Sequence, residues 1–225
     1  MMSIFIDRER ELKALIGWVK SGDHVLVLGL RGYGKTSLLE KLIELLSGEG
    51  LSGALIDCLR VYNGSDLLLE FMDSIQRYGI AADERILREI GLLARNIDEK
   101  MAIIMLFEYV EKLNLSTIIF DEVSTLIRRF AVFKPFRKAG GTVAVGELMK
   151  SLLDRAKFSV IMCDTSINAL YELFREYTGP LFRQYSALLI VEPLDLQSTR
   201  ELVLRLLNAK GIIPSKDSIE CIVEF

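Results

Sequence analysis

The sequence predicts an α/β protein in which a mostly parallel, five-stranded sheet carries helices on both faces. Five short apolar runs have strand character, and segments with apolar residues at helical spacing separate them. Strands and helices that alternate in this way form parallel sheets, because each crossover helix packs on a face of the sheet. The hydrophobic fraction of 51% agrees with strands that are buried on both sides.

The apolar runs also give the order of the expected elements. The expected strands are residues 24–29, 54–59, 116–120, 158–163 and 187–191. The expected helices are residues 8–20, 37–46, 65–78, 83–96, 99–113, 143–156, 168–176, 198–210 and 216–225, and those between 65 and 113 form an α-helical insertion. Asp7 and Ser65 are candidate N-caps, because their side-chain oxygens can accept hydrogen bonds from the amides of a first helical turn.

Composition limits the classes of function. The net charge of −3 gives no overall attraction to nucleic acid, so any basic partner site must be local. Cys58, Cys163 and Cys221 form no CxxC pair, which indicates a reducing cytoplasmic location and argues against a structural zinc site. His24 is the only histidine, which rules out histidine metal clusters. No run approaches the roughly eighteen apolar residues of a membrane span, so we expect no membrane contact.

Residues 29–36, Gly-Leu-Arg-Gly-Tyr-Gly-Lys-Thr, form a complete GxxxxGK[ST] phosphate-binding loop. An apolar strand precedes the loop and a helical pattern follows it, which disfavours the alternative of a glycine-rich turn without a ligand. Backbone amides of such a loop surround phosphate oxygens, and the helix N-terminus adds its positive dipole end. The residues expected at the phosphates are Gly29, Arg31, Gly32, Tyr33, Gly34, Lys35, Thr36 and Ser37. The loop predicts a nucleoside triphosphate site, with Lys35 as the cation for the outer phosphates and Thr36 as a ligand of Mg²⁺.

The second half of the expected site follows the strand at 116–120. Asp121 comes directly after this apolar run, at the carboxyl edge of the sheet, where its carboxylate can hold Mg²⁺ through water. Glu122 is the candidate general base for a water that attacks the γ-phosphate. The alternative is that both acids only cap the following helix. The sequence has no Asn-Lys-x-Asp element that would bind guanine, so we expect ATP rather than GTP.

The strand at 158–163 continues into Asp164, Thr165 and Ser166. If this strand lies between the first and third strands, the Thr165 hydroxyl lies beside the γ-phosphate and can sense whether that phosphate is present. A simple helix cap by Thr165 or Ser166 is an equally weighted alternative.

Together these residues resemble the archaeal ATPase family, P-loop proteins of the AAA+-like and STAND group, over nearly all 225 residues. Phe5-Ile6-Asp7-Arg8-Glu9-Arg10-Glu11-Leu12 is similar to the N-terminal box of that family, and the phosphate loop and Asp121-Glu122 also match. The resemblance implies a P-loop NTPase fold with strand order 5-1-4-3-2. It also makes Ile6 and Arg8 candidate contacts of the adenine base. The alternative is a surface helix start with a solvated Arg8.

The same resemblance covers the C-terminal part of the chain. Gly179-Pro180-Leu181-Phe182-Arg183 is similar to an element of the family in which the arginine contacts the γ-phosphate, although one glycine of that element is missing here. Relatives also usually carry glycine where this chain has Asp164. The implied domains are an ATPase core at 1–194 and a partial, apparently truncated helical lid at 195–225. Apolar surface on that lid would favour self-association, so a homo-oligomer is a candidate state.

Residues 127–138 carry five basic residues, three phenylalanines and no acid. We expect a loop here, and cations mixed with aromatic rings suit a single-stranded nucleic acid or another partner. The alternative, which we favour, is that the phenylalanines pack on the core while the cations stay solvated. Weak binding of DNA or protein is therefore the most that this segment predicts.

The sequence leaves three classes of function. The first is an ATPase, with Glu122, Lys35 and Arg183 as candidate catalytic residues, whose cycle drives a conformational or assembly change. The second is an ATP-gated switch or scaffold that hydrolyses slowly. The third is a small-molecule phosphotransferase, which the Asp121-Glu122 pair disfavours because a base beside the metal ligand suits water.

Overall fold

The computed structural model describes residues 5–138, 140–166, 168, 171–175, 179–215 and 218–219. The side chains of Phe136 and Arg175 are not described. The expected helix at 216–225, with Cys221, and much of the one at 168–176 lie outside the described residues.

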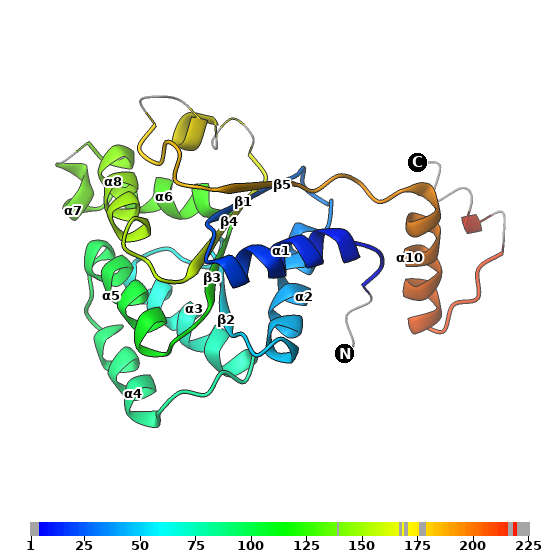
Figure 1. Cartoon of the computed structure of the whole chain (residues 1–225), viewed down its shortest axis with the longest axis horizontal. Helices are drawn as coiled ribbons and strands as arrows, with labels where there is room; N and C mark the ends of the chain where they lie inside the picture. The colour runs from blue at the N-terminus through cyan, green and yellow to red at the C-terminus, as the bar shows by residue number, and fades with distance from the viewer. Residues whose placement is uncertain are drawn as a thin grey trace.

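A parallel sheet of five strands forms the centre of the part of the chain that is described (Figure 1). The strands are β1 Val25–Leu28, β2 Gly53–Asp57, β3 Thr117–Asp121, β4 Ser159–Asp164 and β5 Ala187–Ile190. Their order across the sheet is β2-β3-β4-β1-β5, which confirms the expected order. Every strand pair is parallel, so the segments that follow the strands all begin at the same edge of the sheet.

Helices α1 Glu9–Ser21 and α2 Lys35–Gly48 cover one face of this sheet. Leu15 on α1 and Leu42 on α2 are fully buried against alternate strand residues such as Val27 and Ile161. The alternation arises because successive strand side chains point to opposite faces.

The second face packs against a larger set of helices. These are α3 Gly64–Arg77, α4 Glu84–Leu93, α5 Glu99–Lys112, α6 Val123–Ala131 and α8 Thr142–Leu153, with the short α7 Lys134–Arg137 and the π-helical turn η1 Tyr171–Arg175 beside them. Phe71, Phe120 and Phe130 are almost completely buried in this layer. The large apolar fraction of the sequence thus fills two cores, one on each side of the sheet.

Both expected N-caps differ in the structure. Asp7 and Arg8 have φ angles of 60° and 80°, and Asp7 accepts a hydrogen bond from the adjacent Arg8 amide instead of from the first turn of α1. The cap of α3 is Asn63, whose Oδ1 accepts from the Asp66 amide at 3.0 Å, because α3 begins at Gly64, one residue before Ser65.

The expected loop at 127–138 is also different, because most of it is helical in α6 and α7. Leu126, Ile127 and Phe130 have the spacing of an amphipathic helix and are buried. This segment is therefore part of the second layer of helices.

Helix α10, Leu196–Ala209, stands apart from the sheet at the end of an extended segment after β5 (Figure 1). No residue of α10 is buried, whereas each of the longer core helices has at least one. The N-terminal segment approaches it, since Ser198 Oγ donates to Asp7 Oδ2 at 3.0 Å. Among the described helices, none combines the length and apolar character required to cross a membrane.

Candidate functional site

The phosphate-binding loop leaves the carboxyl end of β1 and leads directly into α2. Gly34 is the residue before α2 and has a φ of 81°, in the left-handed region where glycine is favoured. A Cβ at Gly29 would lie 2.7 Å from the Val191 carbonyl oxygen, so only glycine permits this approach of the loop to the end of β5. The backbone of the loop therefore depends on the two glycines that the motif requires.

Lys35 is 5% exposed, and its ammonium lies inside the loop. Nζ donates to the carbonyl oxygens of Gly29 at 2.8 Å and Leu30 at 3.1 Å. It also donates to Thr165 Oγ1 at 3.0 Å. These are neutral acceptors in water-poor surroundings, and an anionic phosphate oxygen is a stronger partner for an ammonium.

Thr36 and Asp121 join the loop to the end of β3. Thr36 Oγ1 donates to Asp121 Oδ2 at 2.6 Å, and Asp121 is 6% exposed. The other carboxylate oxygen, Oδ1, is buried and has no hydrogen-bond partner. A hydroxyl and a carboxylate with one unpartnered oxygen fit Mg²⁺, which takes few protein oxygens and completes its shell with water and phosphate. Among the described residues, no group of three His, Cys, Asp or Glu side chains is placed to hold a metal ion.

Glu122 follows Asp121 and has a φ of 56°, in the left-handed region. This turn directs its carboxylate away from its own helix and toward the end of β4. Thr165 Oγ1 donates to Glu122 Oε1, and the Thr165 amide lies 3.4 Å from Oε2. Lys35, Thr165 and Glu122 therefore form a continuous chain of side chains, because β4 lies between β1 and β3.

Two buried cysteines lie close to these acids. Burial raises the pKa of the Cys58 and Cys163 thiols well above the usual range, and the negative charge of Asp121 raises both pKa values further. Both thiols are therefore protonated at neutral pH.

A cavity of about 530 Å³ lies between the phosphate loop, the N-terminal segment and α10. Ile6 and Arg8 line it, together with Gly32 and Gly34 of the loop and Leu202 of α10. We call this space the lid cavity. Its apolar walls and its contact with the loop suit a planar base whose phosphates lie on the loop.

Arg8 does not have a free guanidinium there, and it is not solvated. It is 7% exposed, Nη2 donates to the carbonyl oxygens of Tyr33 and Glu192, and Nη1 pairs with Glu11 Oε1 at 2.8 Å. The side chain thus ties the phosphate loop to the segment after β5, and Arg8 also lines the lid cavity.

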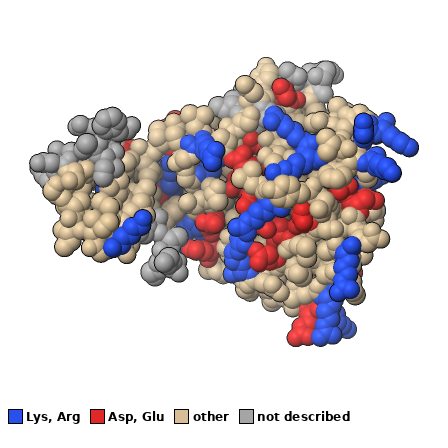
Figure 2. Space-filling model, turned by 180° about the vertical axis from the view of Figure 1, so that it is seen from behind, with Lys and Arg blue, Asp and Glu red and all other residues tan. Residues whose placement is uncertain are grey.

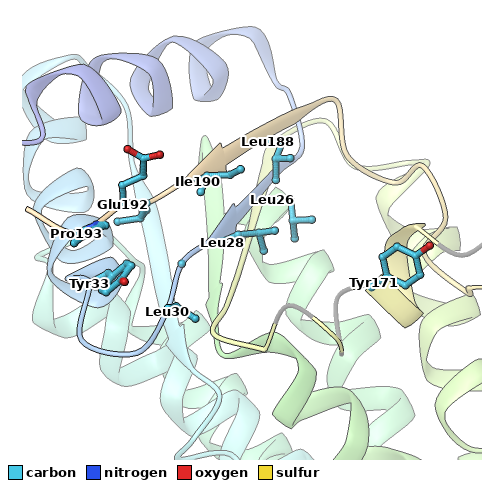
Figure 3. A pocket seen from close by; sticks show the side chains of 11 residues that line it. Leu26, Leu28, Leu30, Tyr33, Tyr171, Leu188, Ile190, Glu192 and Pro193 are labelled. Atoms are coloured by element: carbon cyan, nitrogen blue, oxygen red, sulfur yellow. The ribbon is translucent and has the colours of Figure 1, made fainter.

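A second cavity, of about 290 Å³, lies against β1 and β5 (Figure 3). The side chains of Leu26 and Leu28 and the ring of Tyr171 on η1 border this hollow (Figure 3). Its lining is apolar apart from Glu192 and the tyrosine hydroxyls, so it is unsuited to a phosphate. Both cavities border the loop, the second at Gly29 and Leu30 and the lid cavity at Gly32 and Gly34.

Arg183 is not brought to this site. It lies four residues before the start of β5, in a group with His24 and Leu153 at the amino edge of the sheet, whereas the phosphate loop lies at the carboxyl edge. Its guanidinium is 5.1 Å from the Phe182 ring centroid and its side chain is exposed. Contact of Arg183 with a phosphate of its own chain is incompatible with this placement.

The basic residues at 127–138 do not form one continuous basic surface. Arg129 Nη1 donates to the carbonyl oxygens of Cys58, Leu59 and Val61, and its guanidinium lies 4.2 Å from the Tyr62 ring centroid. Phe130 is buried and makes an edge contact with Phe133.

Exposed cations of this segment remain at Arg128, Lys134, Arg137 and Lys138. Figure 2 shows basic side chains at the end of the molecule that carries α7, while both signs mix over the rest of this face.

Several residues of the site have no sequence signal of their own. The carbonyls of Glu192 and Val191 and the side chains of Pro193, Leu194 and Leu202 border the loop or the lid cavity. The sole indication in the sequence was their position at or after the end of the last expected strand, at the edge where ligands bind in parallel sheets.

The sequence profile of the ATPase domain found predominantly in Archaea matches residues 5–225. The chain belongs to this ATPase-domain family. The match includes the phosphate loop and Asp121-Glu122, which the structure brings together across β1, β4 and β3. A search of curated proteins gave no match.

Solved structures of P-loop AAA+ proteins have the same fold as this ATPase domain. ORC1 of Aeropyrum pernix, solved in complex with DNA, has a TM-score of 0.54 at 15% identity and aligns with 92% of this chain and 50% of its own. ORC2 of the same organism, solved as ADPNP–ADP complexes, has a TM-score of 0.56 at 16% identity, with coverages of 92% and 54%.

Domain III of the replication initiation protein DnaA from Thermotoga maritima has a TM-score of 0.52 at 15% identity, with coverages of 98% and 78%. The chain thus spans about half the length of the two ORC proteins and a larger share of the isolated DnaA domain. At these identities the likeness establishes the fold alone.

Proposed function

We propose that this chain binds Mg-ATP at the carboxyl edge of its sheet and hydrolyses it, with Glu122 as the base that activates water. The observation that carries the proposal is the chain of contacts from Lys35 through Thr165 to Glu122, beside the Thr36–Asp121 pair. Phosphoryl transfer to water requires a cation that binds the phosphates, a hydroxyl, a base and a pair of groups that hold the metal.

The phosphate loop would hold the β- and γ-phosphates through its backbone amides and the N-terminus of α2. Lys35 would exchange its carbonyl partners for phosphate oxygens and neutralise charge that develops on them. Thr36 and Asp121 would hold Mg²⁺, which supplies positive charge to the phosphate oxygens when bound. Arg31 and Ser37 flank this position on the loop and the first turn of α2.

Glu122 would orient the attacking water and accept its proton. Its carboxylate accepts a hydrogen bond from Thr165, and we infer that it exchanges this hydroxyl for the water. The Thr165 hydroxyl, already beside Lys35, then becomes available to the γ-phosphate. When the Thr165 hydroxyl turns from Glu122 to the γ-phosphate, the Glu122 carboxylate becomes free to bind water, so ATP binding would activate the base.

The lid cavity is the proposed place of the adenine, with Ile6 on one wall and Leu202 of α10 on another. Because α10 has no buried residue of its own, a base that fills this cavity would draw α10 onto the core. Arg8 and Asp7 contact both the loop side and the α10 side of the cavity, which supports a coupling between binding and lid position. The coupled conformational or assembly change is therefore closure of this helix.

A slowly hydrolysing ATP-gated switch is the second candidate, and a specific observation favours it. The Glu122 carboxylate accepts a hydrogen bond from Thr165, so a neighbouring side chain restrains the base. A small-molecule phosphotransferase is disfavoured because Glu122 would have to activate an acceptor hydroxyl.

Further parts of the proposal concern partners. The exposed cations near α7 are a candidate weak contact for DNA or protein, and a homo-oligomer is the arrangement in which Arg183 could reach the ATP of a neighbouring subunit. The free, buried Cys58 and Cys163 are compatible with a reducing, cytoplasmic location.

Release of phosphate from ATP, with and without Mg²⁺, tests this function. We expect Mg²⁺-dependent release that GTP supports less well and that EDTA abolishes. Tight ATP binding with no release over many hours would favour the switch instead. Equal rates with and without Mg²⁺ would contradict the role of Thr36 and Asp121.

A further inference from the structure

Asp164 is a buried carboxylate that the steps above do not use. It is the last residue of β4 and is 1% exposed. Oδ2 accepts a hydrogen bond from the Ser124 amide at 2.7 Å, and Oδ1 accepts one from the Ser166 amide at 2.8 Å. A carboxylate without water needs such donors, and both of these belong to the backbone.

The two donors lie in different loops of the site. Ser124 is the second residue of α6 and comes two positions after Glu122, whereas Ser166 directly follows Thr165. Asp164 therefore fixes the backbone that carries the base to the backbone that carries the neighbouring hydroxyl. The two loops lie side by side because β3 and β4 are adjacent parallel strands.

Glu122 and Asp164 each bind the loop that carries the other residue. Glu122 is the N-cap residue of α6, yet its left-handed backbone sends its carboxylate to Thr165, and its side chain does not cap the helix. Asp164 supplies the missing acceptor to the first turn of α6 from the neighbouring loop. The carboxylate of each loop thus binds the other loop.

The geometry points to Asp164 as a positioning residue. It holds the backbones that carry Glu122 and Thr165 in fixed relative positions while the hydrogen bond between these two side chains breaks. This inference rests on the proposed function, in which Glu122 leaves Thr165 to meet a water. The two bonds of Asp164 go to backbone amides that need not move with the Glu122 side chain, so they persist through that step. The placement of the base then depends on Asp164.

Asp164→Asn tests this role because an amide keeps the size of the side chain but has a single oxygen acceptor for two amide donors. We expect kcat for ATP to fall about tenfold or more, with KM within about threefold, since misplaced catalytic groups lose rate rather than ground-state binding. Asp98→Asn is the matched control. Asp98 Oδ1 caps α5 by accepting from the Met101 amide at 2.8 Å, so this variant makes the same carboxylate-to-amide change at a helix cap outside the site and should leave kcat and KM unchanged.

A double variant separates positioning from general stability. If Asp164 acts through Glu122, then Asp164→Asn adds little further loss of rate when Glu122 is already Gln. Independent, multiplicative losses in the double variant would overturn the inference. A kcat for Asp164→Asn within twofold of the parent would also overturn it.

Amide hydrogen exchange gives a measurement that needs neither turnover nor a variant of Asp164. We expect the amides of Ser124 and Ser166 to keep the same protection in the nucleotide-free protein and in Glu122→Gln loaded with Mg-ATP. Loss of protection at either amide on loading would contradict the inference. Absence of turnover in the parent would count against the proposed hydrolysis alone, because the exchange experiment still decides the role of Asp164.

Discussion

Thr165 and Glu122 are hydrogen-bonded to each other across the ends of the neighbouring strands β4 and β3. The same Thr165 hydroxyl accepts a hydrogen bond from Lys35 Nζ at 3.0 Å, so it lies between the ammonium of the phosphate loop and the proposed base. This position agrees with a sensing role, whereas a cap role would direct the hydroxyl to the helix that follows. The first prediction follows from it.

Thr165→Val removes this hydroxyl while nearly preserving the size of the side chain. We expect turnover of ATP to fall by roughly ten- to a hundredfold, because a polar contact that strengthens in the transition state is lost. ATP affinity should stay within a few-fold, as measured by calorimetry. Thr125→Val on α6 is the control and should leave both quantities unchanged. An increase in turnover would show instead that Thr165 mainly restrains Glu122.

Glu122→Gln keeps the hydrogen-bonding shape of the side chain but cannot take a proton at neutral pH. We expect hydrolysis to slow by roughly a hundredfold or more, with ATP still bound. Single-turnover measurement with saturating enzyme isolates the chemical step, and Glu108→Gln on the exposed side of α5 serves as control. A variant that turns over like the parent would leave Glu122 as a partner of Thr165 only.

Arg129→Ala should destabilise the fold rather than affect a partner. The guanidinium of Arg129 serves three backbone carbonyls of the loop after β2, and loss of hydrogen bonds to a charged group costs roughly 1.5–3 kcal/mol. Urea denaturation measures this difference. Arg128→Ala, on the adjacent exposed residue, should change the free energy of unfolding by less than about 0.5 kcal/mol. Equal effects of the two variants would contradict the structural role of Arg129.

Nucleic-acid binding, if present, should depend on the exposed cations near α7. Changing Arg128, Arg137 and Lys138 to Ser should reduce the salt dependence of single-stranded DNA binding by about two units in log–log form. Fluorescence titrations at several salt concentrations measure that slope. An unchanged slope would place bound DNA elsewhere, and a parent that binds no DNA at low salt would leave this surface to a protein partner.

Arg183→Ala should leave ATP affinity and turnover unchanged at protein concentrations where the chain is monomeric, because Arg183 lies at the opposite edge of the sheet. A loss of turnover that appears only at concentrations where the protein assembles would support action on a neighbouring subunit. Sedimentation at the same concentrations supplies the state of assembly. A loss in the monomer would contradict the placement of Arg183.

The sequence predicted the parts of this protein that depend on local patterns. Apolar runs gave the strands, and the glycine spacing gave the loop that holds Lys35. Asp121 could be placed because residues that follow buried parallel strands gather at one edge. The strand order came from the resemblance to a family, and the structure confirmed it.

The remaining features depend on partners that are distant in the sequence. Arg8 donates to backbone carbonyls 25 and 184 positions away, and no residue pattern marks a carbonyl as an acceptor. The cap of α6 comes from Asp164, 40 positions from Ser124, because Glu122 adopts a left-handed backbone that its sequence does not require. Helical structure at 127–138 was missed because basic residues obscure the apolar spacing of α6, and because Pro135 lies within the short α7.

The most direct test of the central claim is calorimetric titration of the parent and of Lys35→Ala with Mg-ATP. Lys35 is the buried cation of the phosphate loop, so its removal should raise Kd by about ten- to a hundredfold, the equivalent of one charge-assisted hydrogen bond to a charged partner. Lys41→Ala, on the exposed side of α2 and paired with Glu44, should bind like the parent. An unchanged affinity of Lys35→Ala for Mg-ATP would contradict the assignment of this loop as the phosphate site.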